Sequence, residues 1–370
     1  MAQLGCGEHQ VEIRDRGGQT VLLDLTEDKI RVSWTRVRDD ISSATIVVNG
    51  RGGCCDQLGQ LETGYHEVHI FRSGVKVWEG ILTRIEYETD MVDLYASDIL
   101  WVAKNTVLPS GYDYSTAGSG AVACGWHMER LLRDWTFAPL GDKWNGAAGV
   151  QRQVGPKEPK TSKAAQKWSM TTWEDFDKFA EDHGMDYSVI GRQINFWDTQ
   201  YRWRTIEEPL RSEYCSNGFA IVEYGNEFAT RVVVTNGNGY GSMRAAPAWA
   251  IAKYGYIDHV VSGYNKAAGA EVPSSADLVS WGEQAAGLLS NSFPQPVRVR
   301  VSENTVLTPQ APYDINDLVA GSWMKAIASD LCRTFSEEQW HKLDRVFVTE
   351  DATGENVTIS TLQAPEEELG

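Results

Sequence analysis

The sequence predicts an α+β fold, mostly β, in which two similar β domains flank an inserted α+β region. Three observations predict this arrangement. Apolar and polar residues alternate along residues 1–97 and again in parts of 213–363, which is typical of half-buried strands. Helical spacing and a long polar stretch appear between them, in residues 98–212. A strand pattern near residue 82 recurs near residue 343.

Residues 1–97 are predicted to form an all-β meander. Val32 and Trp34 alternate with polar neighbours, and the apolar run 44–48 ends at Asn49 and Gly50, which is a strong turn signal. The other predicted strands cover residues 68–70, 75–78, 81–88 and 92–96.

Two helices are predicted in the inserted region. Apolar residues recur with helical spacing from Met128 to Trp135, so they share one face. A second helix begins with Thr172 and Asp175, which are spaced as a capping box, and ends at Gly184.

The rest of the chain alternates between loops and strands. Residues 138–167 are rich in Gly, Pro, Lys and Gln and poor in apolar residues, so they are predicted to form a long loop. A hairpin is predicted at 187–196, and two strands within 219–234 around Gly225 and Asn226. The remaining predicted elements are a glycine loop at 237–241, a helix with Leu278, Trp281, Ala285 and Leu288 on one face, strands at 297–301, 323–328, 343–348 and 357–359, and an acidic tail at 364–370.

One internal similarity links the two ends of the chain. Residues 82–85 read Leu-Thr-Arg-Ile, and residues 343–346 read Leu-Asp-Arg-Val. Each pattern leads into an acidic turn and a second alternating strand. Two short matches can arise by chance in a β-rich chain; if the match is real, the chain carries two copies of one β domain.

Charge and cysteine content exclude several classes of protein. The net charge of −17 argues against a surface that holds nucleic acid, because phosphate binding needs Lys and Arg. Residues 1–18 are not expected to be a signal peptide, and no apolar run is long enough to span a membrane. The six scattered cysteines contain no Cys-x-x-Cys, so neither a zinc site nor a disulfide framework is expected.

No catalytic, cofactor-binding or metal-ligating residue is predicted, and no cofactor is expected. No phosphate-binding glycine loop with its lysine occurs, and His66 and His69 are predicted to point to opposite faces of a strand. Glu86 and Glu88 share a predicted strand face, but a solvated face explains them more simply than a glycosidase does. The adjacent pairs Asp182-His183 and Asp258-His259 have no nucleophile placed beside them by any motif.

Several stretches together resemble baseplate hub, or tail-associated, minor tail proteins of long-tailed actinobacterial phages (siphoviruses). The resemblance covers nearly the whole chain and is most specific in its first 100 residues. The stretches that carry it are 34–42, 44–48, Cys54-Cys55, 66–68, 71–74, 77–80, 83–87, 173–196, 227–231, 317–321 and 354–358.

The resemblance implies a homotrimeric hub at the distal tip of the virion tail, made in the host bacterial cytoplasm. Each subunit would supply two β-barrel-like tube domains, residues 1–97 and 213–363, to a pseudo-sixfold collar. The implied partners are the chain itself, the ring of distal tail protein, the tape measure protein, other minor tail proteins and, as a further contact, the host cell envelope. DNA would pass through without specific binding.

Two other classes stay open at this point. A receptor-binding or carbohydrate-binding tail tip protein would use exposed members of the 14 tryptophans on sugars. A cell-wall hydrolase would need the acidic or metal site that the sequence does not indicate. The sequence therefore favours a structural protein over an enzyme.

Overall fold

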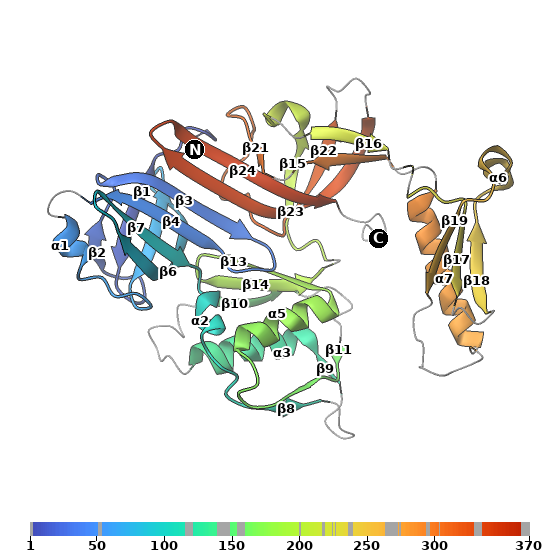
Figure 1. Ribbon diagram of the computed structural model, residues 1–370, viewed down its shortest axis with the longest axis horizontal. Coiled ribbons are helices and arrows are strands. Elements are labelled where there is room, and N and C mark those ends of the chain that lie inside the picture. The colour runs from blue at the N-terminus through green and yellow to red at the C-terminus, as the bar shows by residue number, and fades with distance from the viewer. Residues whose placement is uncertain are drawn as a thin grey trace.

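A sheet of twelve strands, drawn from both ends of the chain, is the largest feature of the computed structural model (Figure 1). The described residues are 3–50, 54–114, 121–138, 149–153, 160–199, 201–216, 219–223, 225, 227–235, 240–262, 273, 275–293, 297–302, 304–328 and 335–363. The strands of this sheet are β1 (His9–Arg14), β2 (Val21–Asp24), β3 (Lys29–Val37), β4 (Ser43–Asn49), β5 (Glu67–Arg72), β6 (Val75–Tyr87), β7 (Met91–Ser97), β15 (Thr205–Arg211), β21 (Thr305–Val306), β22 (Trp323–Ala328), β23 (Phe335–Asp351) and β24 (Gly354–Gln363).

The first and last thirds of the chain share one hydrophobic core. In β7, Val92, Leu94 and Ala96 are buried while the residues between them are partly exposed, as an alternating strand requires. Val346 and Val348 of β23 are buried in the same cluster. Removal of apolar surface from water therefore joins segments about 250 residues apart in the sequence.

The strands predicted in residues 1–97 are confirmed, but they do not form the predicted meander, because β4 pairs with β7 and β1 with β5. The strands β1 and β2 were not among those predicted. A short helix, α1 (Cys54–Leu58), interrupts the strands, and the two runs predicted at 75–78 and 81–88 are the single strand β6. Within the described residues, the large sheet follows an open path of strands rather than a closed one. The barrel-like shape predicted for the two β domains is therefore not seen.

Two three-strand units within the sheet have the same registers. We call β5–β6–β7 the first unit and β22–β23–β24 the second unit. In both, the middle strand pairs with the strand before it through its first half and with the strand after it through its second half. In the first unit, Glu67 pairs with Ile81, Ile70 with Trp78 and Ile85 with Leu94. The corresponding pairs in the second unit are Trp323 with Lys342, Ala326 with Gln339 and Val346 with Ile359.

Each unit has a β-bulge at the same place. The register shifts between Leu82 and Arg84 in the first unit and between Leu343 and Arg345 in the second. A bulge places two residues opposite one and increases the local twist of the strand. The repeated Leu-x-Arg pattern therefore marks the same structural feature twice.

A glycine introduces each unit. The N–H of Gly64 donates to the carbonyl of Leu82 at 2.7 Å, and the N–H of Gly321 donates to the carbonyl of Leu343 at 2.6 Å. Their φ angles are +76° and +89°, in the left-handed region that favours glycine. Both glycines thus turn the chain onto the bulged leucine of the unit.

The inserted region lies beneath the sheet in Figure 1 and has its own core. Phe176 of α5 packs edge-on against Tyr187 and Phe196 of the hairpin β13–β14. The elements are α2 (Leu100–Lys104), β8 (Tyr112–Asp113), β9 (Val122–Ala123), α3 (Cys124–Arg130), the π-helix η1 (Leu131–Phe137), β10 (Gly149–Gln153), β11 (Lys160–Thr161), β12 (Ala164–Ala165), α5 (Thr172–His183), β13 (Met185–Ile190) and β14 (Gln193–Asp198).

Both predicted helices of this region are confirmed with changed details. The face from Met128 to Trp135 is buried as predicted, but the chain continues from α3 as the π-helix η1. The capping box of α5 is formed by Thr171 and Glu174, one residue before the predicted pair, because the Thr171 side chain accepts from the N–H of Glu174. Gly184 ends the helix in the left-handed conformation, as predicted.

The prediction of a long loop at 138–167 is wrong in part. Three short strands lie within it, and β10 pairs in parallel with β14, while β11 and β12 pair with β9 and β8. These strands escaped the sequence pattern because Gly149–Gln153 contains one apolar residue and its partner is distant in the sequence. Residues 139–148 and 154–159 lie outside the described part.

The two strands predicted within 219–234 exist but do not pair with each other. β16 (Phe219–Glu223) pairs with β20 (Val297–Val301), and β17 (Arg231–Thr235) lies between β18 (Gly241–Ala245) and β19 (Asp258–Ser262). The predicted glycine loop falls mostly outside the described residues, and Gly241 begins β18. A 3₁₀ turn, η3 (Ser212–Tyr214), and the helices α6 (Ala248–Tyr254) and α7 (Ser275–Ser292) complete the chain.

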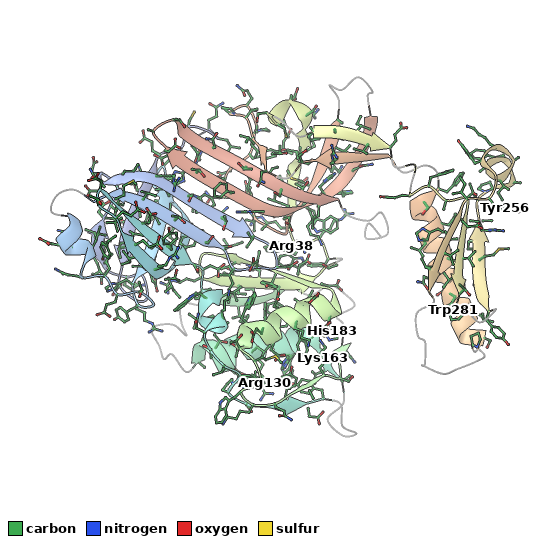
Figure 2. All side chains as sticks on the ribbon, in the orientation of Figure 1. Arg38, Arg130, Lys163, His183, Tyr256 and Trp281 are labelled. Atoms are coloured by element: carbon green, nitrogen blue, oxygen red, sulfur yellow. The ribbon has the colours of Figure 1, made fainter. Side chains whose placement is uncertain are left out.

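Helix α7 packs on one face of the small sheet β17–β19. Trp281 and Ala285 are buried there against Val232 and Val234, and Figure 2 shows Trp281 on α7 and Tyr256 beside the sheet. This unit stands apart from the large sheet in Figure 1. No helix among the described residues is long and apolar enough to cross a membrane. Of the cysteines with described side chains, Cys6, Cys124 and Cys215 are free thiols.

Replacing the two equivalent glycines by alanine should separate backbone strain from packing. A Cβ on Gly64 would meet only Trp101, at 3.4 Å, whereas one on Gly321 would lie 2.3 Å from Trp197. We expect Gly64→Ala to lower the free energy of unfolding by about 1 kcal/mol, through backbone strain. Gly321→Ala should lower it by about 3 kcal/mol, because overpacking is added. Urea unfolding measures both, and equal losses would contradict the packing difference.

Candidate assembly site

Strand pairing between β3 and β23 joins the two ends of the chain, and we call this contact the β3–β23 interface. Residues Val32–Val37 pair antiparallel with Arg345–Glu350, starting directly after the bulge of the second unit. The N–H of Arg38 extends the pairing to the carbonyl of Asp344 at 2.9 Å. The edge of β23 beyond the bulge is thus covered by a strand from the other half of the chain.

A buried ion pair reinforces this contact at one end. Arg72 of β5 donates through Nε and Nη2 to both carboxylate oxygens of Glu355 in β24, at 2.6 and 2.7 Å. The Glu355 carboxylate also accepts from the N–H groups of Gly5 and Gly7. Its side chain has no exposed surface, and that of Arg72 is 4% exposed. The charges therefore depend on each other rather than on water.

Hydrogen bonds and neighbouring charges keep the carboxylates of Glu355 and Glu350 in the charged form. Burial raises the pKa of Glu355, but the hydrogen bonds and charge of Arg72 outweigh it, and the net pKa lies below the ordinary value. The same balance, with hydrogen bonds from His9, lowers the pKa of Glu350. Both carboxylates are therefore ionised at neutral pH.

The tautomer of His9 follows from its two neighbours. The indole N–H of Trp34 can only donate, and it points at Nε2 of His9 at 3.1 Å. Nε2 must therefore accept, which leaves the proton on Nδ1, 2.7 Å from Glu350. His9 thus links β3 to β23 through one hydrogen bond at each ring nitrogen.

A buried arginine ties the interface to β6 and to the segment that precedes β22. The guanidinium of Arg36 donates to the carbonyls of Ile315 and Leu318 at 2.7 and 3.0 Å, and to that of Val77 at 2.7 Å. Burial, with a smaller effect from Arg204, lowers its pKa to about 10, so it stays charged at neutral pH. Three carbonyls from different segments therefore converge on one cation.

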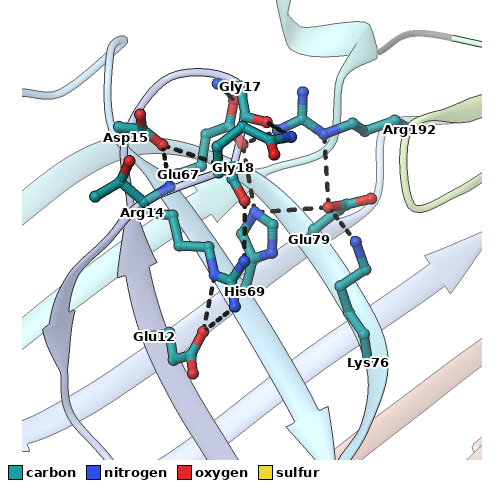
Figure 3. Close-up of polar contacts among 12 residues, drawn as sticks. Glu12, Arg14, Asp15, Gly17, Gly18, Glu67, His69, Lys76, Glu79 and Arg192 are labelled. Atoms are coloured by element: carbon teal, nitrogen blue, oxygen red, sulfur yellow. Dashed lines mark hydrogen bonds and ion pairs between the residues drawn. The ribbon is translucent and has the colours of Figure 1, made fainter.

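The inserted hairpin is docked by Arg192, which lies in its turn (Figure 3). Arg192 contacts the carboxylates of Glu67 and Glu79 on β5 and β6, and His69 lies 3.4 and 3.5 Å from the same two carboxylates. Lys76 completes the cluster with a 2.7 Å bond to Glu79. The first unit thus presents two carboxylates to the turn of the insert, and Arg192 lies between them.

A second polar network docks the other end of the hairpin, at Arg38 (Figure 2). Arg38 pairs with Asp186 of β13 at 2.7 Å and with Asp344 at 3.0 Å. Lys342 donates to the other oxygen of Asp186 at 2.8 Å. Burial, and then the charge of Asp186, raise the pKa of Asp39 beside them to about 7. The end of β3, the second unit and the insert therefore share one set of charges.

The acidic and histidine residues weighed in the sequence are not brought together. Glu86 accepts from the Tyr95 hydroxyl at 2.9 Å and pairs with Arg84, while Glu88 lies beyond the end of β6. The remaining positions are scattered: His66 is half-buried and His69 buried, Asp182 pairs with Lys163, and Asp258 pairs with Arg231. No group of metal-ligating side chains occurs among the described residues.

The residues that build the interface were missed by the sequence analysis. Arg36, Arg72 and Glu355 have no local pattern that predicts burial, since their partners lie 200 to 300 positions away in most cases. The only available indication was the Leu-x-Arg repeat, which located the bulges beside them.

Comparisons with known proteins agree with this architecture at the level of the fold. No protein-family model matches the chain, and no curated protein matches its sequence. A 43 kDa tail protein of prophage MuSo2 from Shewanella oneidensis aligns with a TM-score of 0.56 at 10% identity, over 96% of this chain and 98% of that one. A tail protein from Neisseria meningitidis aligns with a TM-score of 0.54 at 12% identity, over 96% of each chain. The chain has the fold of phage tail proteins.

The same tail-protein fold occurs in a secretion machine. The Escherichia coli c3393 protein, a type VI secretion component described as structurally similar to the phage T4 tail proteins gp27 and gp5, aligns with a TM-score of 0.52. The identity is 9%, and the match covers 96% of this chain and 77% of that one. The tail-protein resemblance seen in the sequence is thus confirmed for the fold.

Removing Arg72 should be strongly destabilising. Arg72→Met leaves the Glu355 carboxylate buried without its cation, so we expect a loss of about 3–5 kcal/mol in the free energy of unfolding. The double variant Arg72→Met/Glu355→Leu should recover most of it. Arg14→Met, at a pair with Glu12 in which the two side chains are 22% and 24% exposed, should cost about 1 kcal/mol or less. Chemical denaturation of the three variants tests this; equal effects of Arg72→Met and Arg14→Met would contradict it.

The contribution of Asp98 to stability should fall as pH rises from 6 to 8. Burial raises the pKa of Asp98 to about 7 although its carboxylate accepts from the N–H groups of Ser42 and Leu100. A raised folded pKa gives stability that is complete below the unfolded pKa and is lost as pH rises through 7. Asp98→Asn should remove this contribution, so the slope of stability against pH becomes more positive than in the wild type by at most one proton's worth. Thermal unfolding across this pH range measures it, and an unchanged slope would contradict the assignment.

Proposed function

We propose that this chain is a structural subunit of a siphovirus tail, three copies of which form the hub at the distal tip. The hub closes the tail tube and joins it to the ring of distal tail protein, the tape measure protein and other minor tail proteins. The observation that carries the proposal is the presence of two units with the same registers and the same bulge in one chain.

The two similar units would let a threefold hub match a sixfold tube. A closed ring interface repeats with the operator that generates it, so a sixfold tube and a threefold hub do not match directly. Three chains that each supply two similar units present six near-equivalent faces. In this arrangement residues 1–97 and 213–363 form the collar, and the inserted region, held on by Arg192 and Arg38, lies outside it.

Charge supports a role as a passage for DNA without binding. With a net charge of −17, acidic residues outnumber the Lys and Arg that would retain phosphates by counterion release. The bore of the hub is therefore expected to be acidic or neutral. The protein acts in the virion, at the tail tip, and performs no catalysis.

Exposed tryptophans favour a second candidate function, a receptor-binding or carbohydrate-binding tip protein. Trp126, Trp168 and Trp249 are 43%, 68% and 62% exposed, and an exposed indole can stack on a sugar ring. They lie on three different segments rather than along one groove, so we rank this function second. A glycan-binding screen on the purified protein distinguishes the two.

Light scattering with size-exclusion chromatography tests the hub directly. The proposed function predicts a homotrimer of about 124 kDa at high protein concentration, three times the chain mass of 41.2 kDa. A species that remains a monomer or a dimer at every concentration would contradict the proposal.

A further inference from the structure

The two units differ at one edge. In the second unit, the edge of β23 beyond the bulge is covered by β3, from Arg345 to Glu350. In the first unit, the same edge of β6 is covered by β5 and its preceding turn only as far as Leu82. Among the described residues, no strand pairs with that edge from Arg84 to Tyr87. The first unit therefore lacks the strand that completes the second.

The chain contains a counterpart of β3 that belongs to the second unit. β3 pairs with β4, and β4 pairs with β7 through Ile46 and Leu94. In the second unit, β21 takes the place of β4, because Thr305 pairs with Ile359, the counterpart of Leu94. Val306 therefore corresponds to Val47. The strand that pairs with Val306 is then the counterpart of β3.

That strand is the segment that ends in β16. Cys215 bridges antiparallel to Leu307, and the N–H of Ser216 donates to the carbonyl of Val306 at 2.9 Å. In the first half of the chain, Arg31 pairs with Val47. Ser216 thus corresponds to Arg31, and Phe219, three residues further on, is assigned to Trp34. Phe219 pairs with Val301, two residues further along the partner strand than the β3–β4 ladder gives, and we assign this irregularity to the partner strand, where Asn304 has a φ of +58°.

We propose that β16 of a second copy pairs antiparallel with the open edge of β6, in the place that β3 occupies on β23. The inference rests on the proposed trimer and names the contact that closes it. Transferring the β3–β23 register gives four residue pairs across the contact, with the β6 residue first: Arg84–Val222, Ile85–Ile221, Glu86–Ala220 and Tyr87–Phe219.

The side chains on both edges suit this contact. Tyr87 is 55% exposed although it is a large aromatic, and it would meet Phe219, while Ile85 would meet Ile221. Arg38 reaches Asp344 at the end of the β3–β23 interface. Its counterpart Glu223 would lie opposite Thr83, the counterpart of Asp344, so this ion pair is not repeated in the proposed contact.

Geometry makes the contact intermolecular. β6 and β16 lie at opposite ends of the large sheet assembly in Figure 1, so one chain cannot pair them with each other. β16 pairs with β20 in a two-stranded sheet, which leaves its second edge without a strand in the described part. Contacts between two different surfaces run head to tail and close into a ring when the rotation allows it. Pairing would also remove two open strand edges per chain.

Cysteine cross-linking tests the register. Residues directly opposite in an antiparallel pair have Cα atoms about 4.5–5.5 Å apart, within the reach of a disulfide. After mild oxidation, the variant Glu86→Cys/Ala220→Cys should give covalent dimers and trimers on non-reducing gels. The control Glu86→Cys/Glu223→Cys is displaced by three residues, about 10 Å, and should not. The single variants report any background from native cysteines.

A second variant guards against effects of the introduced cysteines. Tyr87→Asp places a charge in the proposed contact, and Val75→Asp places one at a comparably exposed position of the same strand, outside the contact. The first should lower the trimer fraction at least tenfold at a fixed concentration, and the second should not. Circular dichroism checks that both variants fold.

The outcomes separate this inference from the proposed function. Cross-linking by the in-register pair alone, with loss of trimer in Tyr87→Asp, supports both. A trimer that forms without that cross-link, or that tolerates Tyr87→Asp, overturns the contact but leaves the hub. A wild-type chain that stays monomeric at every concentration overturns both.

Discussion

The pairing of β3 with β23 is the contact on which the rest of the structure depends. It brings residues about 310 positions apart into one ladder, and it can begin only after the bulge at Leu343 and Arg345 has turned the end of β23 away from β22. Once it forms, Arg36 and the Arg72–Glu355 pair become buried and must find their partners. The contact is therefore selective: a slipped register would leave buried charges unpaired, which costs several kcal/mol.

The inserted region depends on the same contact. Arg38, at the end of β3, and Lys342, on β23, approach Asp186 of the hairpin from two sides only when the strands are paired. The hairpin turn is held separately by Arg192 between Glu67 and Glu79. Two charged contacts, one at each end of the hairpin, fix its orientation on the sheet. The inserted region is thus held to β3 and β23, the strands that would form part of the ring.

Much of the fold could be predicted from the sequence because strand periodicity and turn residues act locally. The strands β3 to β7, the helix ending at Gly184 and the Leu-x-Arg repeat were found this way, whereas β1 and β2 were not. Errors arose where the partner of a segment is distant: β10 was assigned to a loop because its pairing with β14 leaves no local pattern. The capping box was placed one residue late because Thr171 and Thr172 both fit the motif. The buried partners of Arg72 and Arg36 could not be found, since nothing in a single sequence marks an arginine as internal.

An electron cryo-microscopy map of the assembled protein tests the central claim most directly, that one chain supplies two equivalent units to a ring. The account predicts three chains around one axis, with the first unit superposing on the second after a rotation of roughly sixty degrees about that axis. Arg84 should then fall on the position of Arg345, and each open edge of β6 should carry a strand from a neighbour. A ring in which the two units lie at different radii, or in which only one of them reaches the axis, would contradict it.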